Sequence, residues 1–191
     1  MTYQNSSVFS KLHSICYNPD ISETWGRINV SWKNVEKSRG IFSWADIDNA
    51  VQKCLDENIK IYMVISDIPE WIIKKDFTSR SDCFKQFCSF IFSRYGQKIS
   101  IYGICNFIKN KKEFIKYYLI PGIKILNKKS LTALELNGNI SIWFSWMSIL
   151  KFFKIPFSLL VFHNIKFQWL IRKLKLFKKS DKPVWFAADI I

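Results

Sequence analysis

Histidine, glycine and proline are scarce in this sequence, and each shortage excludes a class of protein or site. There are 2 His, 6 Gly and 5 Pro among 191 residues. So few Gly and Pro disfavour a loop-rich all-β domain, whose tight turns need them. His13 and His163 are isolated, and neither stands at metal-ligand spacing from a cysteine. We therefore expect no Cys/His zinc site, no Ser/His/Asp triad, and neither a metal nor a cofactor.

The cysteines form no recognisable framework. Their number is odd and no CxxC pair occurs; they are Cys16, Cys54, Cys83, Cys88 and Cys105. Such a set favours a reducing compartment over a disulfide scaffold. Residues 1–14 are polar and lack the apolar stretch of a signal peptide. The sequence thus favours a cytoplasmic location.

Acidic residues are also few, 15 against 29 Lys and Arg, so the net charge is +14. The excess is densest in residues 151–182, where nine Lys and Arg stand against Asp181 alone. Two interpretations remain: a solvated Lys-rich face, or a basic surface that binds anionic membranes or nucleic acid. No RNP-like, zinc-finger or Gly-rich phosphate motif accompanies the charge. This favours the solvated face over a membrane or nucleic-acid partner.

An uninterrupted apolar run of about 20 residues, which a membrane-spanning helix needs, is also missing. The nearest approach is the stretch 140–165, which Lys151, Lys154 and Pro156 interrupt. Charges at mid-span are costly, and proline breaks helices. A helix followed by a buried strand explains this stretch better.

What the sequence does contain is an alternation of strand and helix patterns, typical of a parallel α/β fold. Hydrophobic residues make up 49% of it, enough for one domain with a core. Strands are predicted at 26–32, 60–66, 99–106, 131–136, 158–163 and 184–187. Helices are predicted at 44–58, 82–95, 112–126, 142–153 and 168–178. Ser43 is a candidate N-cap, and Pro121 should kink or shorten the third helix.

Several segments together resemble the clan A (β/α)8-barrel glycoside hydrolases, nearest to family 39 and similar xylosidase- and cellulase-type barrels. The strongest is RINVSWKNVEKSRGIFSWADID at 27–48, which is similar to the second strand of that family and the helix after it. IKIYMVISDIPEW resembles the third strand with its trailing Pro-x-Trp, and SRYGQKISIYGICN the turn before the fourth. LLVFH resembles the sixth strand, and KPVWFAAD the seventh. The segments occur in family order.

The resemblance implies a fold and a set of binding residues. The fold is a parallel (β/α)8 TIM-type barrel of about six β/α units, spanning residues 24–191 after an irregular segment 1–23. Carbohydrate is the implied ligand. Matching positions that line the family's sugar cleft are Arg27, Trp32, Trp71, Asn106, His163 and Trp185. For Trp32 and Trp71, core packing explains the residue as well as sugar stacking does.

The family's two catalytic glutamates have no counterpart here. The acid/base of the family follows an Asn at the end of strand four, where this chain has Phe107 after Asn106. The nucleophile lies three residues after the strand-seven Trp, which gives Ala188 when counted from Trp185. Neither residue can do the chemistry of a glutamate. Asp189 is a substitute only if the strand end bulges, because adjacent strand residues point to opposite faces.

Other carboxylates do not replace them. Glu113 and Glu135 lie nearest the predicted strand ends, and Glu135 falls within the fifth strand. Glu135 could face the barrel interior, but a rim or loop carboxylate is the simpler interpretation. We therefore expect a glycoside hydrolase-like protein without activity.

The barrel also lacks sequence for strands one and eight. We expect strands two and seven to be unpaired edges, which a second chain or an oligomer would cover. A degraded remnant, a carbohydrate-binding module and a fragment of a split gene all fit this pattern. The alternative from another class is a basic, aromatic-rich protein that binds anionic surfaces through residues 151–182.

Overall fold

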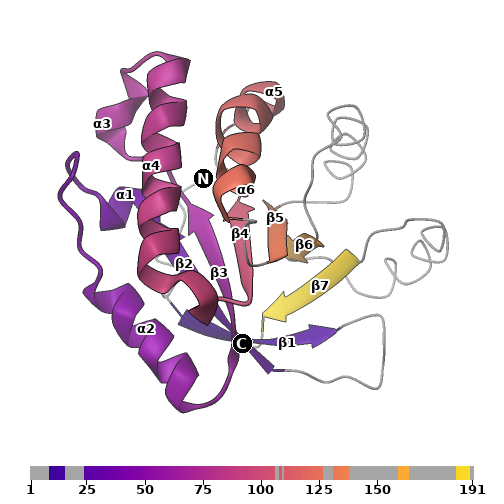
Figure 1. Ribbon diagram of the computed structural model, residues 1–191. Coiled ribbons are helices and arrows are strands. Elements are labelled where there is room, and N and C mark those ends of the chain that lie inside the picture. Colours follow the sequence, from indigo (N-terminus) through magenta and orange to yellow (C-terminus); the bar gives the residue numbers. More distant parts are fainter. Residues whose placement is uncertain are drawn as a thin grey trace, which may run out of the picture.

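Seven strands form a closed barrel in the computed structural model (Figure 1). The structure describes residues 9–15, 24–105, 108, 110–126, 131–137, 159–163 and 184–189, with side chains described at 25–105, 108, 110–126 and 132. The strands are β1 (Phe9–Ile15), β2 (Thr24–Ser31), β3 (Lys60–Ser66), β4 (Ile101–Cys105), β5 (Leu131–Asn137), β6 (Leu159–His163) and β7 (Val184–Asp189).

Strands β2 to β7 follow one another around the barrel in sequence order, and each neighbouring pair is parallel. This confirms the predicted parallel order of these strands, and the helices between β2 and β5 confirm the predicted α/β alternation over that part of the chain. The prediction for β3 is correct to the residue. Its five central residues are all buried, as expected for a strand covered on both faces. The predicted helices at 142–153 and 168–178 lie outside the described residues.

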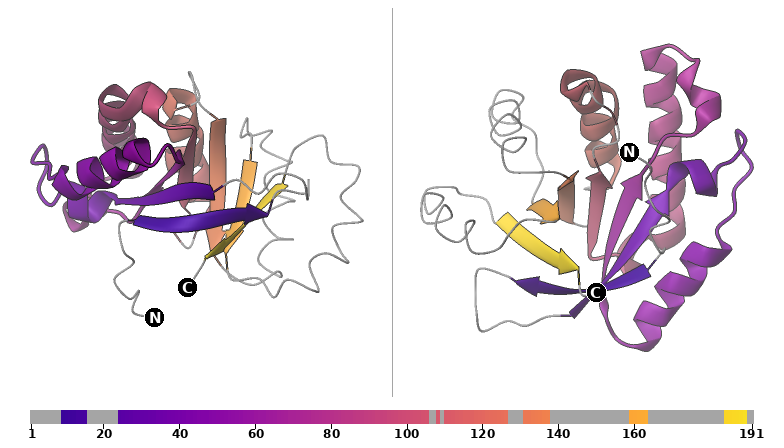
Figure 2. Two further views of the ribbon diagram at one scale, coloured as in Figure 1. Left: turned by 90° about the horizontal axis from the view of Figure 1, so that it is seen from below. Right: turned by 180° about the vertical axis from the view of Figure 1, so that it is seen from behind.

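The prediction that strands two and seven would be unpaired edges was wrong. Strand β1 lies between β2 and β7 and pairs with both, antiparallel in each case (Figure 2). Segment 1–23, expected to be irregular, supplies this strand. Its sequence FSKLHSI is too polar to resemble a core strand, but a ladder is made by backbone groups that any residue except proline supplies. Unpaired groups on β2 and β7 find partners in this way.

The described helices lie on one side of the barrel, outside β2 to β4 (Figures 1 and 2). They are α1 (Trp32–Val35), α2 (Ala45–Asp56), α3 (Glu70–Ile73), α4 (Phe77–Tyr95), α5 (Lys111–Phe114) and α6 (Ile120–Leu126), with short turns η1 (Gly96–Lys98) and η2 (Ile115–Leu119). Helix α2 begins at Ala45 with Trp44 as N-cap, so Ser43 is not the cap. Helix α4 begins five residues earlier than predicted, because the Asp76 side chain accepts from the Ser79 amide at 3.0 Å and caps it.

Pro121 does not end the third predicted helix. It lies in α6, directly after the π-helical turn η2. Proline has no amide proton and its ring crowds the preceding turn, so a regular α-helix cannot pass through it unchanged. The wider π turn accommodates this break, and the helical path continues to Leu126.

Two rows of residues alternate along the strands. Ile28, Met63 and Ile104 belong to the row that packs against the helices, with Phe84 and Ile47 in the same core. Residues of the other row therefore face the barrel interior, because side chains alternate between the two faces of a strand. In β2 to β4 this interior row comprises Trp25, Arg27, Asn29, Ser31, Tyr62, Val64, Ser66, Ile101, Gly103 and Cys105. The Tyr62 side chain fills the space beside Gly103, the middle residue of β4, since a Cβ on Gly103 would lie 2.7 Å from the Tyr62 hydroxyl oxygen.

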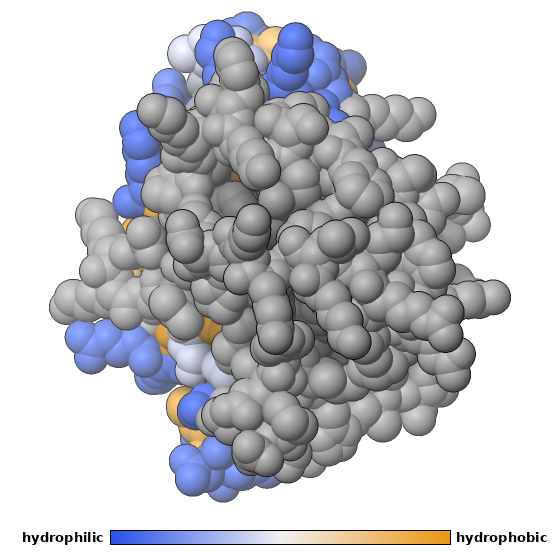
Figure 3. Space-filling model, turned by 90° about the vertical axis from the view of Figure 1, so that its right-hand side faces the viewer, coloured by the Kyte–Doolittle hydropathy of each residue, from blue (hydrophilic) through white to orange (hydrophobic). Residues whose placement is uncertain are grey.

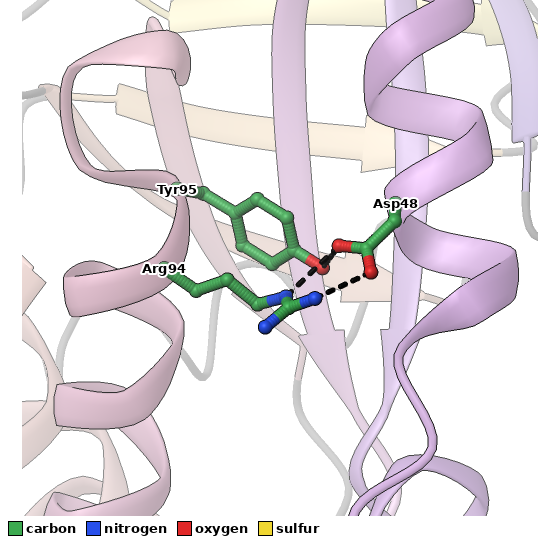
Figure 4. A network of polar contacts seen from close by, with 3 residues as sticks. All are labelled: Asp48, Arg94 and Tyr95. Atoms are coloured by element: carbon green, nitrogen blue, oxygen red, sulfur yellow. Dashed lines mark hydrogen bonds and ion pairs between the residues drawn. The ribbon is translucent and has the colours of Figure 1, made fainter.

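Asp48 joins helices α2 and α4 on the outside of the barrel (Figure 4). Its carboxylate accepts from Arg94 Nε at 2.9 Å and Nη2 at 2.5 Å, and from the Tyr95 hydroxyl at 2.8 Å. The Arg94 hydrogen bond is the largest cause that lowers the pKa of Asp48. Burial, followed by the bond to Asp48, raises the pKa of Tyr95. Both groups therefore keep the charge states that this bonding requires across neutral pH.

We expect Asp48→Asn to lower the free energy of unfolding by about 0.5–1 kcal/mol at pH 7, because the pair is partly exposed and water screens it. A lowered carboxyl pKa adds stability above its ordinary value of about 4, and that stability is lost as pH falls through the lowered pKa. The difference between wild type and Asp48→Asn should therefore vanish at acid pH. Urea unfolding at a series of pH values measures it. A constant difference down to pH 2 would contradict this account.

Where described residues reach the surface in Figure 3, they are mostly hydrophilic with small hydrophobic patches between them. Large exposed apolar side chains among the described residues are Ile41, Leu55, Ile73 and Phe90. Within this part of the chain, no helix has the length and apolar character to cross a membrane.

Candidate functional site at the carboxyl ends of the strands

Parallel strands bring their carboxyl ends to one rim of a barrel, where binding sites of α/β barrels lie. In this chain that rim is formed by the last residues of β2 to β7 and by the segments that follow them. The described part comprises Ser31, Ser66 and Cys105 at the strand ends. The loops that follow β2 and β3 complete it.

A polar network links β2 and β3 at this rim. The Ser66 hydroxyl lies 2.9 Å from Asn29 Oδ1 and 3.0 Å from Asp67 Oδ2. A hydroxyl has one proton, so it donates to one of these oxygens at a time. Asp67 directly follows β3 and has φ of 56°, a left-handed conformation that Asp tolerates better than most residues. The backbone turns there, and the exposed carboxylate of Asp67 lies at the rim.

An ion pair joins the segments that follow the two strands. Lys33 Nζ lies 2.6 Å from Glu70 Oε1, and both side chains are exposed. Their hydrogen bond, together with their mutual attraction, raises the pKa of Lys33 and lowers that of Glu70. Both groups are charged at neutral pH. The rim thus presents an ion pair to solvent.

Glu36 holds these segments together from beneath. Its carboxylate is buried and accepts from Trp32 Nε1 at 2.6 Å and from the Gly40 amide at 2.8 Å. Trp71 Nε1 donates to the Glu36 carbonyl at 2.9 Å. Gly40 has φ of 79°, which favours glycine. One residue therefore fixes the turn after α1 and the segment after β3.

Trp32 is a core residue in this structure and not a stacking platform for sugar. Its exposed fraction is 0%. Its ring stacks on Phe87 at a centroid distance of 5.1 Å and meets Phe84 and Trp71 at 5.4 and 6.3 Å. No face of the indole remains for a ligand. Of the two possibilities weighed from the sequence, packing is the one the structure supports for Trp32.

The remaining predicted binding residues are placed as follows. Trp71 is half-buried at the rim, in α3. Arg27 lies on the interior row of β2, four residues below its carboxyl end. His163 ends β6, opposite Asn137 in β5. Trp185 is the second residue of β7, opposite Val161. Asn106 and Phe107 lie outside the described residues, so their predicted roles stay predictions.

The register distinguishes the two candidate positions in β7. Cys105 is on the interior row of β4 and pairs with Glu135. Glu135 pairs with Val161, and Val161 pairs with Trp185, so Trp185 belongs to the interior row as well. Asp189 lies four residues after Trp185 and shares its row, whereas Ala188 belongs to the other row. Ala188 and Asp189 pair with successive residues of β1, His13 and Leu12. Asp189 therefore needs no bulge to take an interior position, contrary to our expectation.

The two other candidate carboxylates, Glu113 and Glu135, lie in different parts of the fold. Glu113 accepts from Asn110 Nδ2 at 2.8 Å in the capping turn of α5, which explains it without a catalytic role. Glu135 lies on the interior row of β5, opposite Cys105. The sequence therefore placed Glu135 correctly in a strand.

Sequence reasoning missed Asn29, Ser66, Asp67 and Glu36. Asp67 and Ser66 carried a usable signal, because polar residues directly after a buried strand of a parallel sheet lie at the functional rim. Asn29 stands two residues after Arg27 in β2 and therefore lies on the same row. Glu36 stood within the family-like segment, but a buried carboxylate that caps a turn has no sequence signature of its own.

Comparison with known proteins gives one kind of match. No family model matches the chain, and no curated protein does. Among solved structures, a GH10 xylanase from Thermobacillus composti superposes with a TM-score of 0.66 at 10% sequence identity. The superposition covers 83% of this chain and 58% of the xylanase. This chain therefore spans less than two thirds of that enzyme. At this identity the likeness concerns the fold: the chain is similar in architecture to a glycoside hydrolase barrel.

Proposed function

We propose that this chain is a glycoside hydrolase-like protein that binds carbohydrate at the carboxyl rim of its barrel without hydrolysing it. The observation that carries the proposal is the architecture. A parallel barrel similar to that of a xylanase has family-like segments along it in family order. The rim carries the half-buried Trp71, His163 and the Asn29–Ser66–Asp67 network. A sugar-binding site uses an aromatic ring for stacking and polar groups for hydrogen bonds to the sugar hydroxyls.

We infer that β2 to β7 correspond to strands two to seven of an eight-stranded barrel, nearest to family 39. Strand β1 then replaces the wedge that strands one and eight would form. This assignment is supported by the antiparallel pairing of β1, which no strand of a (β/α)8 barrel has. The barrel is thus incomplete in β/α units although its sheet is closed.

The absence of hydrolysis follows from the carboxylates. A retaining glycosidase needs two carboxyl groups about 5–5.5 Å apart, as acid/base and as nucleophile. The resemblance assigns the two glutamate positions to Phe107 and Ala188, and neither residue has an ionisable group. Asp189, on the interior row of β7, is the one nearby carboxylate in that strand. Glu135 is a second carboxylate position on the interior row, in β5, and neither Asp189 nor Glu135 stands where the family has a glutamate.

The experiment separates binding from turnover, and xylan-derived oligosaccharides are the first probe. We expect calorimetry to show binding that changes little with salt, and assays with aryl-glycosides to show no turnover above buffer. Trp71→Ala should weaken the binding, while Phe90→Ala, an exposed aromatic on the outside of α4, should not. Turnover abolished by Asp189→Ala would contradict inactivity.

The alternative function, binding of anionic surfaces through residues 151–182, is tested by the same material. Binding to anionic vesicles or nucleic acid would fall steeply with rising salt, because phosphate contacts are screened and release counterions. Salt-sensitive binding of these probes, with no binding of any sugar, would replace the carbohydrate proposal.

A further inference from the structure

A pair of aromatic rings with a cation over each lies where helix α4 begins beside α5 and the turn η2 (Figure 1). Phe77 and Tyr117 stack with a centroid distance of 5.1 Å and an interplanar angle of 15°. The Arg80 guanidinium lies 4.8 Å from the centroid of Phe77, and Lys116 Nζ lies 5.0 Å from that of Tyr117. Lys116 is exposed and the other three are half-buried, so rings and cations share one face of the molecule.

Positive charge surrounds these rings. Residues 74–80 and 111–117 contain six Lys and Arg against Asp76 and Glu113. Both carboxylates accept hydrogen bonds in the turns that begin helices α4 and α5, at 3.0 and 2.8 Å. They are thus engaged at the helix starts, and this face keeps a net positive charge.

Three of the lysines, Lys74, Lys112 and Lys116, are exposed, and none forms an ion pair with a carboxylate of the described residues. Lys112 lies one helical turn before Lys116, so both are on the same face of the helix. Arg80 Nε donates to the Lys75 carbonyl at 2.7 Å, which anchors the guanidinium and brings Lys74, the preceding residue, close to the ring pair. The face therefore combines one fixed cation with three that can reorient.

We propose that this face binds single-stranded nucleic acid. The α4–η2 surface comprises Lys74, Phe77, Arg80, Lys112, Lys116 and Tyr117. Sites for single strands combine cations that contact phosphates with aromatic rings on which unpaired bases stack. Lys116 is exposed, so it can exchange its contact with the Tyr117 ring for a phosphate and leave that ring to a base. The surface shares no residue with the proposed sugar site and lies outside residues 151–182.

The chemistry favours a single strand over two other anionic partners. The bases of a duplex are already paired and stacked, so aromatic rings stack on bases that are unpaired. A membrane surface is bound by cations together with apolar side chains that insert among the lipids. Of the large exposed apolar side chains among the described residues, Ile73 is the one that borders the α4–η2 surface, through its carbonyl contact with Arg80. The rings themselves are half-buried and offer little for insertion.

Fluorescence anisotropy with the full chain and a labelled oligothymidylate of about 15 nucleotides tests the proposal, because one such site covers about 4–16 nucleotides. The single strand should bind about tenfold more tightly than the same strand paired with oligoadenylate, and binding should weaken as salt rises. Tyr117→Ala should weaken binding about tenfold, whereas Tyr117→Phe, which keeps the ring, should bind as wild type does. Phe90→Ala removes an exposed ring farther along α4 and is the matched control.

Charge reversal gives a second test in case Tyr117→Ala does not fold. Lys112→Glu and Lys116→Glu alter exposed side chains, so the fold should be kept. Each should weaken binding and reduce the slope of log K against log salt by about 0.7 or more. Lys98→Glu, on η1 at the opposite end of α4, is the matched control and should change both quantities little.

The proposal is overturned if the wild-type chain binds no oligothymidylate near physiological salt, or binds the duplex as tightly. It is equally overturned if both charge reversals bind as wild type does, since the strand would then bind elsewhere on the chain. Binding of anionic vesicles without binding of the oligonucleotide would replace it with a membrane surface. Sugar binding plays no part in these outcomes.

Discussion

Glu36→Ala should lower the free energy of unfolding by about 1–3 kcal/mol, chiefly through the buried indole of Trp32. The substitution leaves the indole N–H of Trp32 and the amide of Gly40 without their acceptor, at 2.6 and 2.8 Å in the wild type. Trp32 is fully buried, so water cannot replace the lost partner without opening the core. Each unsatisfied buried group costs about 1–3 kcal/mol. Urea unfolding, followed by tryptophan fluorescence, measures the loss.

Two variants make this result specific. Glu36→Gln keeps one acceptor oxygen and presents an NH2 group to the other donor, so its stability should fall between those of Glu36→Ala and wild type. Glu70→Gln removes an exposed carboxylate from the same rim and should leave the unfolding midpoint near that of wild type. Equal midpoints for Glu36→Ala and Glu70→Gln would show that the buried carboxylate does not hold the rim.

Leu12→Pro should open the barrel. Leu12 pairs with Trp25 in β2 and with Asp189 in β7, so it lies where β1 is bonded on both sides. Proline removes one backbone donor and cannot fit a paired central strand, at a cost of about 3 kcal/mol or more. Both flanking strands would then expose unpaired backbone groups. We expect oligomers or aggregates in size-exclusion chromatography with light scattering.

Leu12→Ala is the matched control, because it shortens the same side chain but keeps the backbone donor. It should stay monomeric. Hydrogen exchange provides the positional test: β2 and β7 should lose protection in Leu12→Pro, and β3 and β4 should keep it. A monomeric Leu12→Pro chain with unchanged exchange in β7 would show that β1 does not close the sheet in solution.

The elements that could be predicted from the sequence are those whose signal is local. Strand β3 is a continuous apolar run, and its bounds were predicted correctly. Helix α4 was predicted only in its second part, because residues from Phe77 to Ser81 have no apolar periodicity and the cap at Asp76 was overlooked. Strand β1 could not be predicted, because both of its partners are defined only once the other strands are in place.

The candidate site shows the same division. Residues of one strand, such as Asn29 or Asp189, could be assigned to a row from parity alone. Whether Trp32 stacks on sugar or packs in the core depended on Phe84 and Phe87, more than fifty residues away. The juxtaposition of Cys105 with Glu135 required the register between two strands, which composition and spacing do not contain.

The closure of the barrel by β1 has a consequence for the order of events in folding. The pairing of β1 with β2 joins nearby parts of the chain, whereas the pairing of β1 with β7 joins residues 12–15 to residues 186–189. Contacts between such distant segments form slowly, because the chain loses the entropy of a long loop before the contact repays it. During synthesis β2 can pair with β1 early. The other edge of β1 can pair only after β7, at the end of the described chain, has been made. While that edge is unpaired, two copies of the chain are most able to exchange strands.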